Sequence, residues 1–120
     1  MSIAFLSALR SKDPSTQVGA CIVNDENKIV AVGYNVCHAE LNAVLNSNTA
    51  SLRGCTIYST LFPCNECAKV IIQSGIKRVV FYKDDKKGTT SNDASKLMFE
   101  RASINYAPYC SSGRLISFNL

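Results

Sequence analysis

Residues 55–82 alternate between strand-like and helix-like segments, and this alternation restricts the fold of the chain most strongly. Cys55–Thr60 and Arg78–Tyr82 have strand composition, and Cys64–Ser74 between them has helical spacing and is followed by Gly75. Strands joined through a helix pair in parallel by right-handed crossovers, and helices then cover the faces of the sheet. The pattern therefore predicts an α/β fold.

The remaining segments extend this sheet. Apolar spacing and turn residues predict further helices at Ile3–Leu9, His38–Asn48 and Asp93–Ser103, and further strands at Val18–Val23, Ile29–Tyr34 and Arg114–Phe118. We therefore expect one domain over residues 1–120, a three-layer α/β/α sandwich around a mixed five-stranded sheet. In such sheets ligands bind beyond the carboxyl ends of the parallel strands, where helices begin.

Composition and charge narrow the class of protein. Apolar residues make up 47% of the chain and charged residues 18%, which indicates a globular domain. A net charge of +4 suits a small anionic ligand and argues against a nucleic-acid-binding surface. The chain has no run of eighteen apolar residues, so the sequence predicts no membrane-spanning helix. The apolar segment Met1–Leu9 is short, lacks a preceding basic residue and is followed by Arg10, so we expect a helix and not a secretion signal. We therefore expect a cytoplasmic protein with reduced thiols.

The six cysteines fall into two groups. Four of them stand singly in apolar surroundings and are expected to pack in the core: Cys21, Cys37, Cys55 and Cys110. The other two, Cys64 and Cys67, lie three residues apart at the start of a predicted helix. At that position both can face one ion, and the free N–H groups of the helix favour their thiolates.

His38-Ala39-Glu40 opens the other helix that begins at the predicted ligand edge, and His38 is the only histidine in the chain. Zinc takes nitrogen and thiolate ligands, and a catalytic zinc keeps three protein ligands and a water. His38, Cys64 and Cys67 supply that set of three. A carboxylate beside the water can take its proton and hand it to a substrate, so Glu40 is the predicted general acid–base.

These residues allow two other interpretations. A structural zinc site needs a fourth ligand, from Cys37 or Cys55, and would leave Glu40 without a role. A thioredoxin-like dithiol of Cys64 and Cys67 would leave His38 and Glu40 unexplained. We therefore favour a catalytic zinc.

The order H-x-E followed by P-C-x-x-C is the signature of zinc deaminases, and the chain is similar to the cytidine and deoxycytidylate deaminase superfamily. Residues 37–43 (CHAELNA) and 61–68 (LFPCNECA) resemble in particular the dCMP deaminases, as do residues 11–14, 18–20 and 33–35. The resemblance covers most of the chain, from about Phe5 to Tyr82, and is weaker beyond.

The resemblance implies hydrolytic deamination of dCMP to dUMP and ammonia, which feeds dTMP synthesis. In this mechanism zinc lowers the pKa of its water. Glu40 takes the proton, gives it to N3 of the cytosine as C4 is attacked, and later delivers a proton to the leaving amine. The partner is thus a small nucleotide, and no nucleic acid is expected.

Substrate contacts are also implied by the resemblance. It suggests that Asn35 bonds the sugar 3′-hydroxyl and that Ala20 and Ala39 contribute backbone groups near the base. Phe62 either packs on the pyrimidine or is an ordinary buried aromatic, and both alternatives stay open. The 5′-phosphate needs a cation or helix-end amides. Lys12, before the first strand, is the candidate, with a plain solvated lysine as the alternative.

The sequence departs from the family at one junction. Gly33-Tyr34-Asn35 runs directly into Val36-Cys37-His38, where dCMP deaminases carry a long loop with effector-binding residues. Either the chain has lost this loop or the sequence omits a segment. We favour omission, also for part of the first helix; an intact mass near 13.1 kDa would contradict it.

The family further implies dCTP and dTTP as effectors and a homo-oligomer, often a hexamer. Apolar residues on Leu41–Leu45 and Val70–Ile72 are candidates for either interface or core.

Other functions remain as alternatives. A tRNA adenosine deaminase needs a basic surface and an RNA-gripping C-terminal element, whereas Gly113–Leu120 holds one Arg and no Lys. A free-nucleoside cytidine deaminase usually has Cys where His38 stands. A non-catalytic, zinc-stabilised interaction module belongs to a different class, and the presence of Glu40 argues against it.

Overall fold

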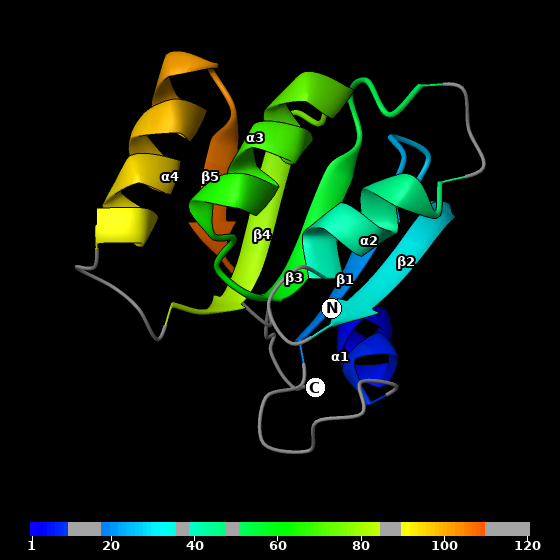
Figure 1. The fold of residues 1–120 in the computed structure, drawn as a ribbon. Helices are drawn as coiled ribbons and strands as arrows, with labels where there is room; N and C mark the ends of the chain where they lie inside the picture. Colours follow the sequence, from blue (N-terminus) through cyan, green and yellow to red (C-terminus); the bar gives the residue numbers. More distant parts are fainter. Residues whose placement is uncertain (10–17, 36–38, 48–50, 85–89, 110–120) are drawn as a thin grey trace.

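The computed structural model describes residues 1–9, 18–35, 39–47, 51–84 and 90–109 (Figure 1). Within these ranges the helices are α1 (Ser2–Ala8), α2 (Ala39–Leu45), α3 (Asn65–Ser74) and α4 (Thr90–Arg101), and the strands are β1 (Val18–Val23), β2 (Ile29–Asn35), β3 (Thr56–Leu61), β4 (Arg78–Lys83) and β5 (Asn105–Pro108). The strands form one sheet in the order β2-β1-β3-β4-β5. β1 pairs antiparallel with β2 and β3, and β3, β4 and β5 pair in parallel, which confirms the mixed five-stranded sheet.

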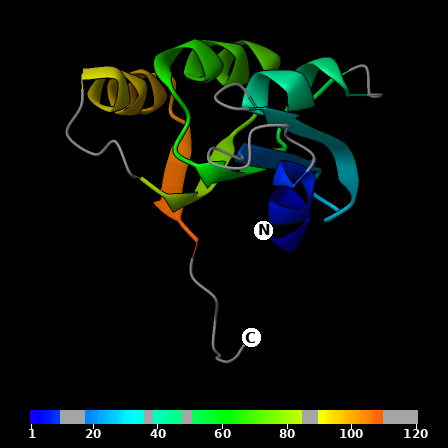
Figure 2. The ribbon, with the colours of Figure 1, turned by 60° about the horizontal axis from the view of Figure 1, so that its bottom comes forward.

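The helices form two layers. α2, α3 and α4 cover one face of the sheet and α1 lies on the other (Figure 2). β3, β4 and β5 follow one another in a single direction across the sheet, so two right-handed crossovers place α3 and α4 on the same face. The three-layer α/β/α arrangement is therefore confirmed, with α1 as the helix of the second layer within the described residues.

Local turn chemistry fixes two of the junctions. In the hairpin between β1 and β2, the Asn24 side chain accepts hydrogen bonds from the N–H groups of Glu26 (3.0 Å) and Lys28 (2.9 Å). Asn27 there has a positive φ of 64°, which Asn tolerates better than most residues. α3 ends at Gly75, whose φ of 87° is the left-handed conformation that favours glycine. Both features agree with the sequence.

One described strand is not predicted from the sequence. Asn105–Pro108 forms β5 at a position with no predicted element, whereas the predicted strand Arg114–Phe118 lies outside the described residues and stays a prediction. β5 is short and mostly exposed, and among the described residues it pairs only with β4. It is therefore an edge strand of the described sheet, a position at which Pro108 is tolerated. α4 begins at Thr90, earlier than the predicted Asp93. Its first turn is polar, so it has no apolar spacing from which the start could be predicted.

The core lies between the sheet and the layer of α2, α3 and α4. Its largest fully buried apolar side chains come from five elements and the connection after α3: Ile22, Ile57, Ile71, Ile76, Val79 and Phe99. Cys21 and Cys55 are buried as predicted, whereas Cys37 and Cys110 lie outside the described residues. No helix in the described ranges is long and apolar enough to cross a membrane.

Candidate active site

The two cysteines of the predicted zinc site lie at the start of α3. Cys64 is the N-cap, with an extended backbone (φ −72°, ψ 171°), and Cys67 lies fully buried in the first turn. The first N–H groups of a helix have no partner within it and carry partial positive charge, which favours thiolates. β3 ends at Leu61, so both cysteines follow the carboxyl end of a parallel strand, at the predicted ligand edge.

Glu40 meets this helix start from the neighbouring helix. It is the second residue of α2, and its side chain is only 2% exposed. A carboxyl group this deeply buried requires polar partners. The Ser59 hydroxyl on β3 donates to Oε2 of Glu40, and the Cys67 thiol also hydrogen-bonds to the Glu40 side chain. The structure therefore brings Glu40 and Cys67 together above β3.

Cys67 is buried beside two groups that can carry negative charge, Glu40 and Cys64. Burial raises the pKa of the Cys67 thiol far above its usual value, and the negative charges of Glu40 and Cys64 raise it further. A hydrogen bond from the backbone N–H of Leu41 acts in the opposite direction. A divalent cation would offset the repulsion among these groups and displace the thiol protons. Two sulfur donors suit zinc and exclude magnesium or calcium, which take oxygen ligands, so this donor set fits zinc.

The third predicted ligand, His38, lies outside the described residues. Among the residues that the structure does describe, no group of three or more His, Cys, Asp or Glu side chains could hold a metal ion. Cys55, one alternative fourth ligand, precedes β3 while Cys64 follows it, so a six-residue strand, about 20 Å long, separates them. This excludes Cys55 from the same site; Cys37 lies outside the description. Neither Cys64 nor Cys67 forms a disulfide bond within the described part of the chain.

α2 rests directly on β2, and this contact fixes where its first turn lies. A Cβ at Gly33 would fall within clashing distance of the Ala43 nitrogen and the Ala39 carbonyl oxygen, so only glycine permits the approach. The Asn42 side chain donates to the carbonyl oxygen of Tyr34 at 2.8 Å and ties the helix to the end of β2. The turn that carries the buried carboxyl group is thus held by backbone contacts.

A row of small residues lies beneath the start of α2. Ala20 on β1 is in register with Gly33 on one side and Ser59 on the other, and both Ala20 and Ala39 are fully buried. These alanines lie on the elements that carry the site, and their predicted backbone contacts to the base stay predictions. Asn35 ends β2, opposite Val18, and its side chain lies outside the description, as does the whole of Lys12.

Phe62 packs in an aromatic cluster. Its ring is 7% exposed and makes edge contacts with Phe81 at 4.9 Å, Phe99 at 6.0 Å and Tyr106 at 5.9 Å between centroids, while Lys96 Nζ lies 5.4 Å from the ring centre. Such packing is what the alternative of an ordinary buried aromatic predicts. A contact of Phe62 with the pyrimidine stays a prediction.

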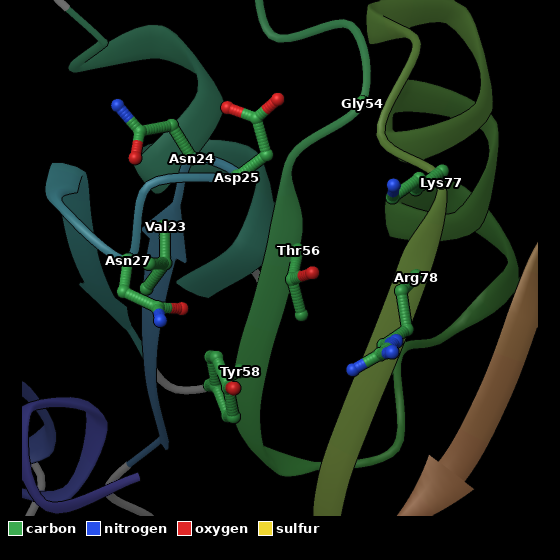
Figure 3. Close-up of a pocket in the computed structure, with 9 residues that line it drawn as sticks. All are labelled: Val23, Asn24, Asp25, Asn27, Gly54, Thr56, Tyr58, Lys77 and Arg78. Atoms are coloured by element: carbon green, nitrogen blue, oxygen red, sulfur yellow. The ribbon is translucent and has the colours of Figure 1, made fainter.

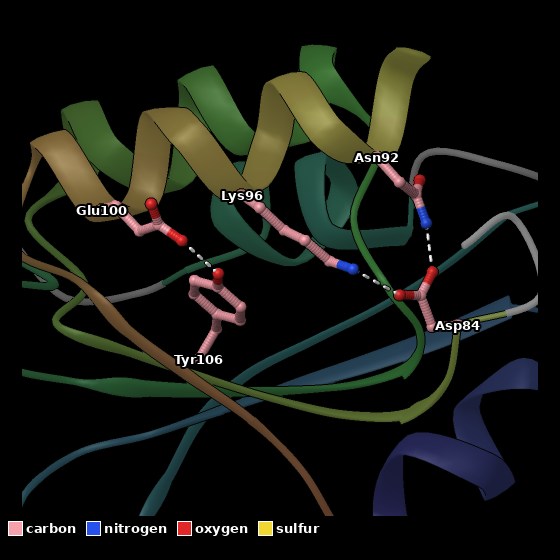
Figure 4. Close-up of polar contacts among 5 residues, drawn as sticks. All are labelled: Asp84, Asn92, Lys96, Glu100 and Tyr106. Atoms are coloured by element: carbon pink, nitrogen blue, oxygen red, sulfur yellow. Dashed lines mark hydrogen bonds and ion pairs between the residues drawn. The ribbon is translucent and has the colours of Figure 1, made fainter. Parts of the chain in front are cut away.

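A polar network ties α4 to the carboxyl end of β4 beside this cluster (Figure 4). Lys96 Nζ lies 3.0 Å from Asp84 Oδ2, and the buried Asn92 side chain donates to Asp84 Oδ1. Farther along α4, the Tyr106 hydroxyl donates to Glu100 at 2.6 Å. These contacts hold the helix that packs on Phe62, and thus support the connection from β3 to Cys64.

A surface hollow of about 200 Å³ lies at the other end of the sheet (Figure 3). It is formed where the β1–β2 hairpin turn meets the starts of β3 and β4. Its lining includes Asp25, Lys77 and Arg78 with several uncharged polar side chains. None of the described residues predicted for catalysis or binding lines this hollow, so it is separate from the site formed by Glu40, Cys64 and Cys67.

Sequence reasoning missed three residues that build this site. Ser59, Gly33 and Asn42 hold or admit the turn of α2, and none was singled out. Ser59 carried a signal, because it follows the fully buried Ile57 by two residues and so faces the same apolar side of β3. A hydroxyl at such a position needs a buried partner.

Comparison with known proteins agrees with the motifs. Residues 1–83 match the profile of the family described as the cytidine and deoxycytidylate deaminase zinc-binding region. The deoxycytidylate deaminase of Mus musculus is 47% identical, over 91% of this chain and 76% of that protein. The probable deoxycytidylate deaminase of Drosophila melanogaster is 40% identical, over 99% of this chain and 74% of that protein.

A solved structure supports the fold. The dCMP deaminase of the cyanophage S-TIM5, in complex with dCMP and dUMP, superposes with a TM-score of 0.76. The match covers 90% of this chain and 92% of that chain at 23% identity, which shows a shared fold.

The comparison with the mouse protein also bears on the junction between Asn35 and Val36. The alignment extends over 136 positions, more than the 120 residues of this chain, so the mouse protein holds additional residues within the aligned region. That these residues fall between Asn35 and Val36 stays a prediction.

Proposed function

This chain belongs to the cytidine and deoxycytidylate deaminase family, and on that premise we propose that it hydrolyses dCMP to dUMP and ammonia. The observation that carries the proposal is the contact of a buried Glu40 with Cys67 at the start of α3. It joins the acid–base group of one motif to the metal-binding group of the other. The deoxycytidylate deaminases that match most of the chain favour dCMP over the tRNA and free-nucleoside alternatives and over a non-catalytic module.

His38, Cys64 and Cys67 would hold the zinc ion. Bound zinc would supply a Lewis acid that activates the attacking water. The two thiolates would neutralise the charge of the ion, and the N-terminal N–H groups of α3 would stabilise them.

Glu40 moves the protons of the reaction. Its carboxylate takes a proton as water attacks C4 of the cytosine and gives it to N3. It then takes a second proton from the new hydroxyl on C4 and delivers it to the amino group, which leaves as ammonia as the C4 carbonyl forms. The side chain is shielded from bulk water, so protons pass between substrate and carboxyl group without exchange with solvent.

Substrate contacts are proposed for Asn35, Ala20, Ala39, Lys12 and Phe62. The position of Asn35 at the end of β2 and the burial of both alanines on elements of the site support their part of the proposal. For Lys12 the support is the resemblance to the family alone. Phe62 has the weakest support, because other aromatic rings surround it.

Assembly, regulation and location are likewise proposals that rest on the family. We expect a homo-oligomer, by resemblance a hexamer, with dCTP and dTTP as effectors, in the cytoplasm. Leu45 at the end of α2 is 71% exposed, which supports its use in an interface, whereas Ile71 on α3 is fully buried in the core. The candidate apolar residues thus divide between the two uses.

The decisive experiment measures ammonia release from dCMP, deoxycytidine and an adenosine-containing tRNA anticodon stem, each with and without a zinc chelator. We expect release from dCMP alone, lost on chelation. Ammonia release from another substrate instead would assign the protein a different substrate within the same superfamily. No ammonia release from any of the three substrates, with the full-length chain and zinc present, would favour the non-catalytic module.

Glu40→Gln tests the proton carrier. We expect turnover to fall by about 10²- to 10⁴-fold, with zinc content unchanged. Glu66→Gln is the matched control, because Glu66 also lies in a first helical turn beside the cysteines, yet is exposed and pairs only loosely with Lys69 at 3.8 Å. Unchanged turnover in Glu40→Gln would refute the assigned role.

A further inference from the structure

We infer that Ser59 is a positioning residue for Glu40, whose hydroxyl holds the carboxyl group in the direction that proton transfer requires. The inference rests on the proposed deaminase function and adds to it a residue that neither motif contains. It is carried by the contact of Ser59 Oγ with Glu40 Oε2 in a place sealed from solvent.

Ser59 stands at a position where an apolar side chain would be expected. It is fully buried on β3, on the face that carries α2 and α3, two residues after the fully buried Ile57. Its row neighbour Ala20 shows that a small apolar side chain fits there. Burying a hydroxyl costs free energy unless it is hydrogen-bonded, so steric needs alone do not account for serine.

The hydroxyl has two partners, Glu40 Oε2 and the carbonyl oxygen of Leu61, the latter at 2.7 Å. A hydroxyl has one hydrogen to donate and lone pairs to accept with. It can therefore donate to the carboxylate before proton transfer. Afterwards it can accept from the protonated carboxyl group while donating to Leu61. The contact with Glu40 is kept at each stage of the proposed reaction.

Two isosteric variants at one position isolate the hydroxyl. Ser59→Thr keeps it and Ser59→Val lacks it, and any cost of the added carbon atoms is shared by both. We expect kcat for dCMP to be about tenfold lower in Ser59→Val than in Ser59→Thr, because a misaimed carboxyl group slows proton transfer. KM should differ by less than about twofold, because no contact with dCMP is assigned to Ser59.

Thr60→Val is the matched control. Thr60 is the next residue of β3, is also buried, and accepts a hydrogen bond from the N–H of Gly19 at 3.1 Å. Its side chain points to the opposite face of the sheet. We expect this variant to unfold at lower urea concentration than the parent while its kcat stays within about twofold of it.

A second readout does not pass through turnover. The urea midpoints of zinc-loaded Ser59→Thr and Ser59→Val should differ, and the difference should shrink when Glu40→Ala is added, because the hydroxyl then has no carboxyl group to hold. Equal kcat values in the two Ser59 variants overturn the inference, as does an equal loss in Thr60→Val. If the parent releases no ammonia from dCMP, the proposed function fails, and the midpoint cycle alone decides whether Ser59 holds Glu40.

Discussion

Gly33→Ala should damage both the stability and the chemistry of this protein, because the added methyl group points into the backbone of α2. A Cβ at this position would lie 2.8 Å from the Ala43 Cα and closer still to the Ala43 nitrogen and the Ala39 carbonyl oxygen. These are backbone atoms, so no side-chain rotation relieves the clash. α2 must move as a unit, and Glu40 moves with it.

The size of the effect follows from the distances. Ordinary contact begins near 3.4 Å, so α2 must retreat by about 1 Å. Overpacking of this kind costs about 3 kcal/mol in the free energy of unfolding, which lowers Tm by roughly 10 °C in a domain of this size. A displacement of about 1 Å in a catalytic group costs about 100-fold in kcat.

The assay combines thermal unfolding with dCMP turnover measured well below Tm. Gly19→Ala is the matched control, since its Cβ would press on the α1 backbone, against the Ala4 carbonyl oxygen and the Ala8 nitrogen, on the other face of the sheet. It should lower Tm similarly and kcat much less. If Gly33→Ala keeps the parent's Tm and kcat, or if Gly19→Ala loses kcat equally, the reasoning is wrong.

Two smaller predictions concern the contacts of α4. Lys96→Met should lower the free energy of unfolding by about 1–2 kcal/mol in urea titrations, because it leaves the largely buried Asp84 without its ion pair; Lys69→Met, which removes an exposed pair, should cost under about 0.5 kcal/mol. The hydrogen bond to Glu100 raises the pKa of the Tyr106 phenol above 10.0, so its stabilising effect is present below that pH and lost as pH rises through the raised value. Tyr106→Phe should therefore be less stable than the parent by a few tenths of a kcal/mol near pH 8, and a difference that does not shrink as pH rises through the raised pKa would contradict this.

The parts of the site that could be predicted from sequence are those whose residues carry their own chemistry. Cys64 and Cys67 were predicted as a pair because their spacing and their place before a helix have few other uses. Glu40 was predicted because it follows His38 by two residues in the sequence. The sheet followed from the alternation of strand and helix, and α3 ends where Gly75 predicts that it should.

The residues that were missed depend on which elements touch. Gly33 resembles a glycine at the end of any strand until α2 is seen to cross it. Ser59 could be placed on the buried face of β3, but alternation along a strand does not tell which helix lies above. β5 was missed for a different reason: four mostly exposed residues that end in Pro108 carry no apolar alternation.

The antiparallel pairing of β1 with β3 has a kinetic consequence. The β1–β2 hairpin with α2, and the β3–α3–β4 unit, are each built from contacts at shorter sequence separation than the pairing of β1 with β3. The bridge from Ala20 to Ser59 and the contact of Glu40 with Cys67 span the boundary between these two halves and must await their docking. The site is therefore complete only once the two halves have docked, and partial opening of the native protein at this boundary would separate Glu40 from Cys67. A metal ion with ligands from both halves would hold them together, and its dissociation rate would report how often that boundary opens.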